Sequence, residues 1–230
     1  ALPILIAEGV ATQAEVDGWL SEFETFLDKE FDAGKSYKAN KADWLDGKWA
    51  GLTLPGDEDR RGKTAFPKTR LLEIGRQITT IPDRIDAHKT VKRVIDNRRE
   101  AIEKGENIDW GTAEHLAFAT LLDEGYPVRL SGQDSVRGTF TQRHSDVIDQ
   151  KTEEHYTPLN NIRAGQAHYE VIDSALSEEA VLGFEYGFSL ADPNTLTLWE
   201  GQFGDFVNGA QVVIDQFISS GERKWLRMSG

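Results

Sequence analysis

The stretch of residues 177–225, SEEAVLGFEYGFSLADPNTLTLWEGQFGDFVNGAQVVIDQFISSGERKW, decides the fold of this chain. Ser177 can cap a first helix through its hydroxyl, apolar residues then recur at helical spacing, and Asp-Pro-Asn at 192–194 ends that helix. Residues 196–199 (LTLW) predict a short strand, and a second helical period runs over 203–221. A helix that leads through a short apolar strand into a second helix indicates an α/β fold.

The same pattern extends upstream of that stretch. Asp109 can cap a helix that Gly125 ends, and the apolar residues between them share one face. Residues 128–130 (VRL) and 169–172 (YEVI) predict two further strands. Residues 105–230 therefore follow the order helix, strand, loop, strand, helix, strand, helix, which predicts a mostly parallel sheet with helices on its faces.

The first 104 residues are mainly helical in pattern. Apolar stripes predict helices at three places, namely 1–34, 68–80 and 89–104. We expect an ordered loop over 35–67, because three of its residues need apolar surroundings: Trp44, Trp49 and Leu52. The sequence thus predicts a helical connector over 1–104 and the N-terminal part of an α/β domain over 105–230.

The composition limits the partners and the compartment. The 230 residues carry 26 Lys and Arg against 39 Asp and Glu, a formal net charge of -13, which argues against nucleic acid and anionic membrane surfaces as partners. The chain has no cysteine, so a disulfide framework and a thiolate zinc site are excluded and a reducing compartment is expected. No apolar run approaches the roughly 20 residues that a membrane-spanning helix needs.

Two carboxylates stand at the ends of predicted elements, Glu178 directly after the helix cap and Glu200 after the strand. Ligands of open α/β sheets bind at such ends. A structural interpretation of Glu178 is that it complements the helix dipole, worth about 0.3–1 kcal/mol, which Glu179 could also do. The functional interpretation is a carboxylate that bonds a ligand nitrogen beside an apolar pocket. On these residues alone, both interpretations stay open.

Two residue pairs in the predicted helices raise similar alternatives. Phe203 and Phe206 fall on the apolar face of their helix, where an aromatic pair belongs to a core more often than it forms a platform for a flat heterocycle. Gly183 and Gly187 each cost about 1 kcal/mol relative to alanine inside a helix. We expect the close approach of another helix or backbone, within one subunit or between two, to offset that cost.

The loop over 131–144 holds polar groups that are either solvated or functional: Gln133, Asp134, Arg137, Gln142, Arg143 and His144. Its glycines lack the GK[ST] ending and the GxGxxG spacing of phosphate-binding loops. The five histidines form no HxH or HxxxH pair, so no metal site is predicted. From the residues alone, the function stays open.

Several stretches nevertheless resemble one family. The segments IDWGTAEHLAFATLL (108–122), VRLSGQDSVRGTFTQRH (128–144), LSEEAVLGFEYG (176–187) and LWEGQFGDFVNGAQVVIDQFISSGERKW (198–225) look like the thiamine-diphosphate-dependent decarboxylase component of 2-oxoglutarate dehydrogenase. The lead-in NKADWLDGKWAGL (40–52) with RRGKT (60–64) resembles the bacterial form. The resemblance covers nearly the whole chain. It implies an internal fragment with part of the pyrimidine-binding domain, because the family's GDG-type motif for the diphosphate and Mg²⁺ is absent.

In that family, a glutamate at a helix start, nine residues before a glycine, bonds N1′ of the aminopyrimidine ring of thiamine diphosphate. Glu178 and Gly187 match this spacing, and a carboxyl beside N1′ suits acid–base chemistry on the cofactor. The Mg²⁺ would be held by a domain outside this chain. The site residues that the resemblance implies are Glu178 and His144 as catalytic residues, with Glu178, Gln202, Phe203 and Phe206 in contact with the cofactor.

The resemblance further implies a homodimer, a lipoyl-bearing acyltransferase component as partner, and 2-oxoglutarate as a substrate within the tricarboxylic acid cycle. The expected location is the cytoplasm of a bacterium, or the mitochondrial matrix if the source is a eukaryote. Two alternatives stay open: a non-catalytic scaffold or interaction domain of the same fold, and a related 2-oxo-acid decarboxylase. The fragment alone is expected to be inactive.

Overall fold

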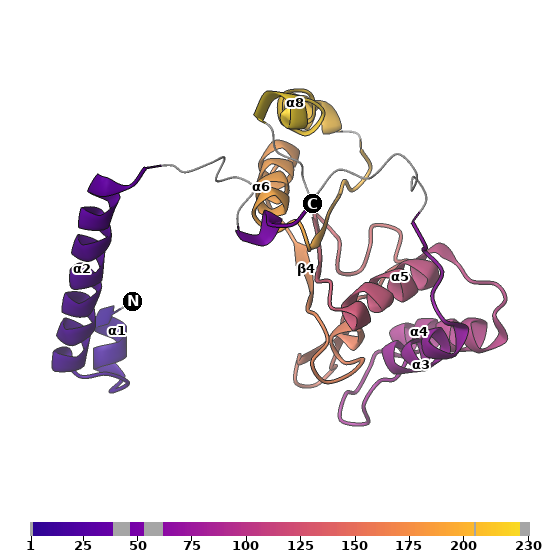
Figure 1. Ribbon diagram of the computed structural model, residues 1–230. Helices are drawn as coiled ribbons and strands as arrows, with labels where there is room; N and C mark the ends of the chain where they lie inside the picture. The colour runs from indigo at the N-terminus through magenta and orange to yellow at the C-terminus, as the bar shows by residue number, and fades with distance from the viewer. Residues whose placement is uncertain (1, 39–46, 53–61, 205, 226–230) are drawn as a thin grey trace. The chain divides into compact units, whose positions relative to one another are not determined.

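The computed structural model describes residues 2–38, 47–52, 62–204 and 206–225. The chain divides into two compact units, residues 1–46 and 47–230 (Figure 1). The second unit contains a three-stranded parallel sheet with helices around it, which confirms the predicted α/β class. The domain boundary expected near Gly105 stays a prediction.

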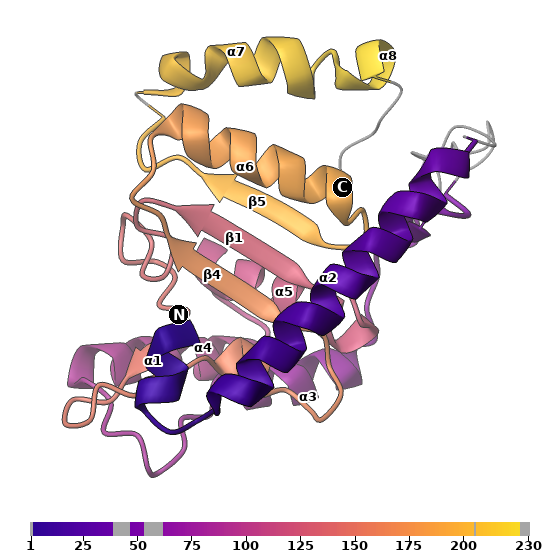
Figure 2. The same cartoon turned by 90° about the vertical axis from the view of Figure 1, so that its left-hand side faces the viewer.

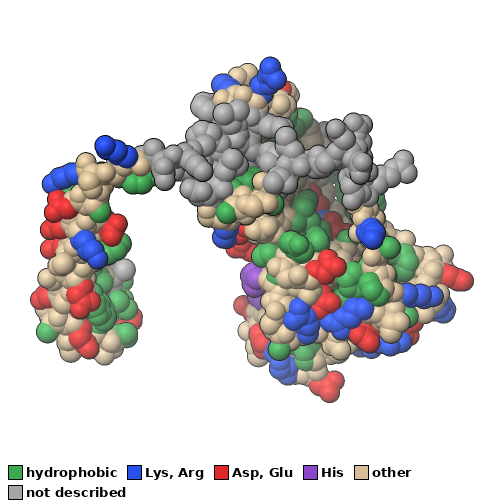
Figure 3. Space-filling model, in the orientation of Figure 1, with side chains coloured by type: hydrophobic (Ala, Val, Ile, Leu, Met, Phe, Trp, Pro, Cys, Tyr) green, Lys and Arg blue, Asp and Glu red, His purple; other side chains and the backbone are tan. Residues whose placement is uncertain are grey.

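The first unit is a pair of helices, α1 (Leu2–Ala7) and α2 (Gln13–Ser36). The single helix predicted over 1–34 is therefore wrong. Gly9 takes a left-handed conformation with φ 70°, and Thr12 starts the second helix with a capping box, in which its backbone N–H donates to the Glu15 carboxylate at 2.8 Å. Hydrophobic side chains run along this unit (Figure 3), and four of those predicted as a stripe are exposed: Leu20, Phe23, Phe26 and Leu27.

The main sheet has the strand order β4-β1-β5, with every pair parallel (Figure 2). Its strands are β1 (Val128–Gly132), β4 (Tyr169–Asp173) and β5 (Leu196–Glu200), where the sequence predicts them. Val128 of the central strand pairs with Tyr169 on one side and with Leu196 on the other. Because the strands are parallel, their carboxyl ends meet at one edge of the sheet, where ligands of α/β folds bind.

Two long helices flank this sheet, α5 (Trp110–Glu124) and α6 (Glu178–Ala191). Alternate side chains of a strand point to opposite faces. Val128 packs with Leu122 of α5 in the main core, whereas its neighbour Arg129 reaches Glu185 of α6 at 2.7 Å. The two helices therefore cover opposite faces of the sheet (Figures 1 and 2).

The helix caps agree with the sequence. The carboxylate of Asp109 accepts a hydrogen bond from the backbone N–H of Thr112 at 2.7 Å, and Gly125 ends α5 in the left-handed region. The hydroxyl of Ser177 accepts from the backbone N–H of Ala180 at 3.4 Å and starts α6. The predicted helices before residue 105 are also present, as α3 (Lys68–Ile78) and α4 (Lys89–Lys104). Since α3 places Ile74 in the main core, it packs in the same unit as the sheet.

The single helix predicted over 203–221 is wrong. The chain instead forms four short helical segments, namely η4 (Val207–Ala210), α7 (Gln211–Val213), the π-helix η5 (Ile214–Ile218) and α8 (Gly221–Trp225). Gly204 has φ 71°, which a regular helix does not allow, so Phe203 and Phe206 precede the first segment instead of lying on a helix face. Gly221 begins α8 and does not end a helix.

Some short elements are not predicted by the sequence patterns. The strands β2 (Val147–Ile148) and β3 (His155–Tyr156) form a small antiparallel pair, and two turns of 3₁₀-helix occur, η2 (Gly47–Trp49) and η3 (Pro158–Asn160). Within the loop predicted over 35–67, Trp49 is half-buried and donates Nε1–H to the carbonyl of Leu190 at 2.6 Å. Leu52 is exposed, and Trp44 lies outside the described residues.

The two glycines of α6 differ in their surroundings. A Cβ at Gly183 would meet Cγ2 of Val213 at 4.0 Å, so the helical segments after β5 pack on this position. Among the described residues, no atom lies within 4 Å of such a Cβ at Gly187. The close approach expected at Gly187 therefore stays a prediction.

The buried His115 of α5 makes stability depend on pH. Burial, together with repulsion from Arg98, lowers the pKa of His115 from 6.5 to about 3. In the window between these two values the unfolded chain binds a proton that the folded chain does not, so the free energy of unfolding falls as the pH is lowered through it. We expect His115→Gln to flatten the pH dependence of urea unfolding across this window. Parallel profiles for wild type and His115→Gln would contradict the assignment.

Candidate functional site

A small pocket of about 80 Å³ lies at the carboxyl ends of β1 and β5, beside the start of α6. The loop after β1, the first turn of α6 and the segment after β5 each contribute to its wall. This is the edge of a parallel sheet at which ligands bind. The lining residues are Gln133, Glu178, Trp199, Gly201, Gln202, Phe203, Gly204, Phe206 and Val207.

Glu178 is the first residue of α6, and its side chain is half-buried in the pocket wall. Its Oε1 accepts a hydrogen bond from Nε2 of Gln133 at 2.9 Å, and its Oε2 makes no hydrogen bond within the described chain. Glu179 is exposed and does not line the pocket. Glu179 can therefore complement the helix dipole, while Glu178 offers one carboxylate oxygen to a ligand.

Aromatic rings form another part of the pocket lining. Phe203 and Phe206 are 61% and 66% exposed, so neither belongs to the core that the sequence alternatives included. The ring of Phe140, from the loop after β1, meets Phe203 edge to face with centroids 6.1 Å apart. A flat heterocycle that enters here would gain apolar contact on its faces.

Two buried polar atoms of the lining lack a hydrogen-bond partner in the described chain, Oε1 of Gln133 and Nε1 of Trp199. A buried polar atom without a partner costs about 1–3 kcal/mol, so each favours a ligand with complementary polar groups. The pocket therefore presents the Glu178 carboxylate beside exposed rings, and two of its lining residues carry a buried acceptor and a buried donor without partners. This donor set fits a flat ring with several nitrogens, such as an aminopyrimidine.

The structure brings together four of the five predicted site residues and leaves out His144. That residue does not line the pocket. Its backbone has φ 48°, and its Nε2 is buried without a partner among the described residues. Burial, with the nearby charges of Arg98 and Arg137, lowers the pKa of His144, so its imidazole is neutral at pH 7. The catalytic role of His144 stays a prediction.

The other charged residues of the loop have structural partners. Asp134 pairs with Arg137, and neither lines the pocket. Glu200, the other carboxylate that the sequence places at the end of a predicted element, pairs with Arg143 and does not line the pocket either.

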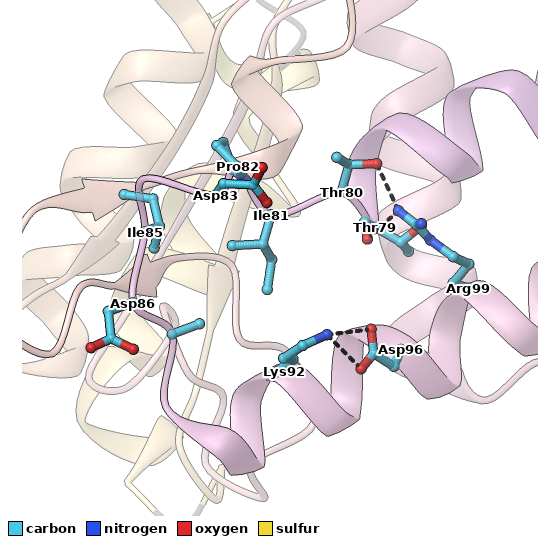
Figure 4. A pocket seen from close by; sticks show the side chains of 11 residues that line it. Thr79, Thr80, Ile81, Pro82, Asp83, Ile85, Asp86, Lys92, Asp96 and Arg99 are labelled. Atoms are coloured by element: carbon cyan, nitrogen blue, oxygen red, sulfur yellow. Dashed lines mark hydrogen bonds and ion pairs between the residues drawn. The ribbon is translucent and has the colours of Figure 1, made fainter.

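A larger hollow of about 360 Å³ lies between the turn after α3 and the start of α4 (Figure 4). Most of its charged side chains have partners: Lys92 pairs with Asp96 at 2.9 Å, Asp86 pairs with Lys151 at 2.9 Å, and Arg99 donates to the carbonyl of Thr79 at 2.7 Å and to the Thr80 hydroxyl at 2.6 Å, while the carboxylate of Asp83 is exposed. No partnerless buried side-chain atom of the described chain belongs to its lining. It therefore presents no group that calls for a ligand, despite its size.

The sequence patterns do not single out three residues in or beside this site as ligand contacts. Gln133 was one of several polar loop residues, although its position directly after a buried strand could have singled it out. Trp199 belongs to the apolar run that predicts a strand. Its position in that run does not indicate that its Nε1 is buried without a hydrogen-bond partner. Phe140 contacts Phe203 because of the conformation of its loop, which hydrophobic periodicity does not predict.

Two further features concern the described residues as a whole. No three of their His, Asp or Glu side chains are placed to hold a metal ion. None of their helices is long and apolar enough to cross a bilayer.

Comparison with known proteins gives the family. The family model "Transketolase, pyrimidine binding domain" matches residues 106–230. The chain is 61% identical over 228 residues to the 2-oxoglutarate dehydrogenase E1 component of Brucella anthropi, and 60% identical over 228 residues to those of Brucella canis and Brucella suis. Each alignment covers 98% of this chain and 23% of the relative, so the chain spans about a quarter of the length of these proteins. The chain belongs to the family of the transketolase pyrimidine-binding domain.

Proposed function

We propose that this chain supplies the aminopyrimidine half of a thiamine diphosphate site in a 2-oxoglutarate dehydrogenase E1 component. The whole protein would decarboxylate 2-oxoglutarate and transfer the acyl group to a lipoyl group on an acyltransferase partner, in the tricarboxylic acid cycle of a bacterial cytoplasm. One observation carries the proposal. Glu178 presents a carboxylate oxygen in a pocket that Phe203 and Phe206 also line. The 61% identity to the E1 component of Brucella anthropi supports the choice of substrate.

The residues of the pocket would hold the aminopyrimidine ring in distinct ways. Glu178 would share a proton with N1′ of the ring. Phe203 and Phe206 would lie against its faces, and Gln202 would line its edge. The partnerless Oε1 of Gln133 would accept a hydrogen bond from the exocyclic amino group. The diphosphate and Mg²⁺ would be bound by residues outside this chain.

Thiamine diphosphate, when bound, supplies the electron sink that makes decarboxylation of a 2-oxo acid possible. The part of Glu178 is to hold or release a proton at N1′, as a general acid and base. Gln133 donates the 2.9 Å hydrogen bond to Oε1 of Glu178, so Oε2, which has no partner in the described chain, would be available to the ring. A second protomer that covered the exposed rings would exclude water from this proton and strengthen the charge interaction across the pocket.

The exposed rings of Phe203 and Phe206 also support a homodimer. One side of the pocket is open in a single chain, and a second protomer that closed it would bury both rings. The same protomer could approach α6 at Gly187, where the described chain leaves space for it.

The proposed split of the site has a direct test. The complete subunit is expected to release CO₂ from 2-oxoglutarate only after thiamine diphosphate and Mg²⁺ are added, whereas these 230 residues alone release none. Pyruvate and a branched-chain 2-oxo acid serve as comparison substrates. Turnover by the 230-residue chain would overturn the split site, and a cofactor-loaded complete subunit that preferred another 2-oxo acid would overturn the substrate.

A further inference from the structure

Arg143, near the end of the loop after β1, is 1% exposed and uses all five of its guanidinium N–H donors. Nε and Nη2 donate to the carboxylate of Glu114, at 2.7 Å and 3.0 Å. Nη1 and Nη2 donate to the carboxylate of Glu200, at 2.9 Å for Nη1. Nη1 also donates to the carbonyl of Ser135 at 2.7 Å. One buried side chain thus joins α5, the end of β5 and the loop after β1.

Two of these three acceptors stand directly beside the pocket. Ser135 lies two residues after Gln133, which bonds Glu178. Glu200 is the last residue of β5 and is followed by Gly201 and Gln202 of the pocket lining. The third acceptor, Glu114, belongs to α5 and is a fixed point on the helix that covers the sheet.

The backbone around Arg143 is closely packed. A Cβ at Gly132 would collide with the carbonyl oxygen of Glu200, so the ends of β1 and β5 touch directly. From the other side, Nη2 of Arg98 donates to the carbonyls of Gln142 and Arg143, at 2.5 Å and 2.6 Å. The loop is therefore held from α4 as well as from α5.

We infer that Arg143 is a positioning residue that sets the separation of the two pocket walls, the loop that carries Gln133 and the segment that carries Gln202 and Phe203. It does not itself line the pocket. Its effect on catalysis rests on the proposed function, because the pocket must hold a ligand for the separation to matter. The structural part of the role is independent of the ligand.

A planar fork with five donors is what the site requires. Lysine would keep the charge but offers three donors from one nitrogen, so Arg143→Lys cannot bond both carboxylates and the Ser135 carbonyl in the same geometry. A matched control exists in Arg129, which is 8% exposed and bonds the Glu185 carboxylate through Nε and Nη2, at 2.7 Å and 2.9 Å. Arg129 joins β1 to α6 and has no bond to either wall segment.

The test is hydrogen–deuterium exchange on the complete subunit without cofactor, followed over residues 133–145 and 198–204. Arg143→Lys is expected to raise exchange in both segments by at least about tenfold, because lysine has two donors fewer and the loss of one charge-assisted hydrogen bond already corresponds to about tenfold. Arg129→Lys is expected to lower the melting temperature about as much as Arg143→Lys does. It is not expected to raise exchange over 133–145 or 198–204. If Arg143→Lys fails to fold, Glu200→Gln keeps the shape of the site and is expected to raise exchange over 198–204.

A second measurement on the same variants is the dissociation constant for thiamine diphosphate, from quenching of tryptophan fluorescence. It should rise about tenfold in Arg143→Lys and stay unchanged in Arg129→Lys. Exchange that rises no more in Arg143→Lys than in Arg129→Lys would overturn the positioning role, whatever the cofactor does. If the wild-type subunit binds no thiamine diphosphate, the proposed function is contradicted. The positioning role of Arg143 is not, because the exchange comparison needs no cofactor.

Discussion

Glu178→Gln in the complete subunit is expected to lower the rate of 2-oxoglutarate decarboxylation by a factor of about 10²–10⁴, the usual contribution of a positioned acid–base group. Glutamine fills the same volume and can keep the hydrogen bond to Gln133. It cannot hold or release the proton at N1′, so the loss should appear in kcat while the fold is kept. The measurement is CO₂ release at saturating thiamine diphosphate and 2-oxoglutarate.

The neighbouring Glu179 supplies the matched control. It has the same chemistry and the same first turn of α6, but its side chain is exposed and outside the pocket. Glu179→Gln is therefore expected to leave the rate unchanged. If Glu178→Gln retained turnover within a few-fold of wild type, Glu178 would be a helix-dipole residue and the chain would fit the scaffold alternative.

Arg129→Met is expected to lower the free energy of unfolding by about 3–5 kcal/mol, because it breaks a buried ion pair from one side only. Arg129 bonds both carboxylate oxygens of Glu185, which is 4% exposed on α6. Its guanidinium also lies over the rings of Phe188 and Phe184, at 4.8 Å and 5.3 Å from their centroids. Methionine fills the space and leaves the Glu185 carboxylate unpaired against those rings.

Urea unfolding of the 230-residue chain measures this loss, and two further variants give it meaning. Arg163→Met removes a partly exposed ion pair with Asp123 and should cost at most about 1 kcal/mol. Arg129→Met combined with Glu185→Leu removes both charges and should recover most of the stability, since an apolar pair can replace a buried ion pair. A loss below about 1 kcal/mol in Arg129→Met alone would show that the pair is screened by solvent.

Much of the fold follows from local patterns. The caps at Asp109 and Ser177, and the stop at Gly125, fix α5 and α6 because a side-chain oxygen or a left-handed glycine satisfies the helix ends within a few residues. The strands β1, β4 and β5 are short apolar runs between such signals. Patterns fail where a single backbone angle decides where a helix begins or ends. Gly9 and Gly204 take positive φ and interrupt two helices that the apolar period alone would continue.

The site is predictable to a smaller extent. Glu178, Gln202, Phe203 and Phe206 follow from the resemblance, and the structure places them in one pocket. The hydrogen bond between Gln133 and Glu178 joins residues 45 positions apart, and no spacing rule relates them. The five bonds of Arg143 likewise depend on three separate elements meeting in space, which only the packed sheet determines.

The strand order β4-β1-β5 also governs how this chain acquires its structure. Val128 pairs with Tyr169 and Leu196, so every strand pairing of this sheet joins residues that are far apart in the sequence. Loop closure has to be completed before any of these pairings contributes. During synthesis the central strand is therefore completed only after residues 196–200 have been made, and the folding rate of this unit is set by topology more than by its well-capped helices.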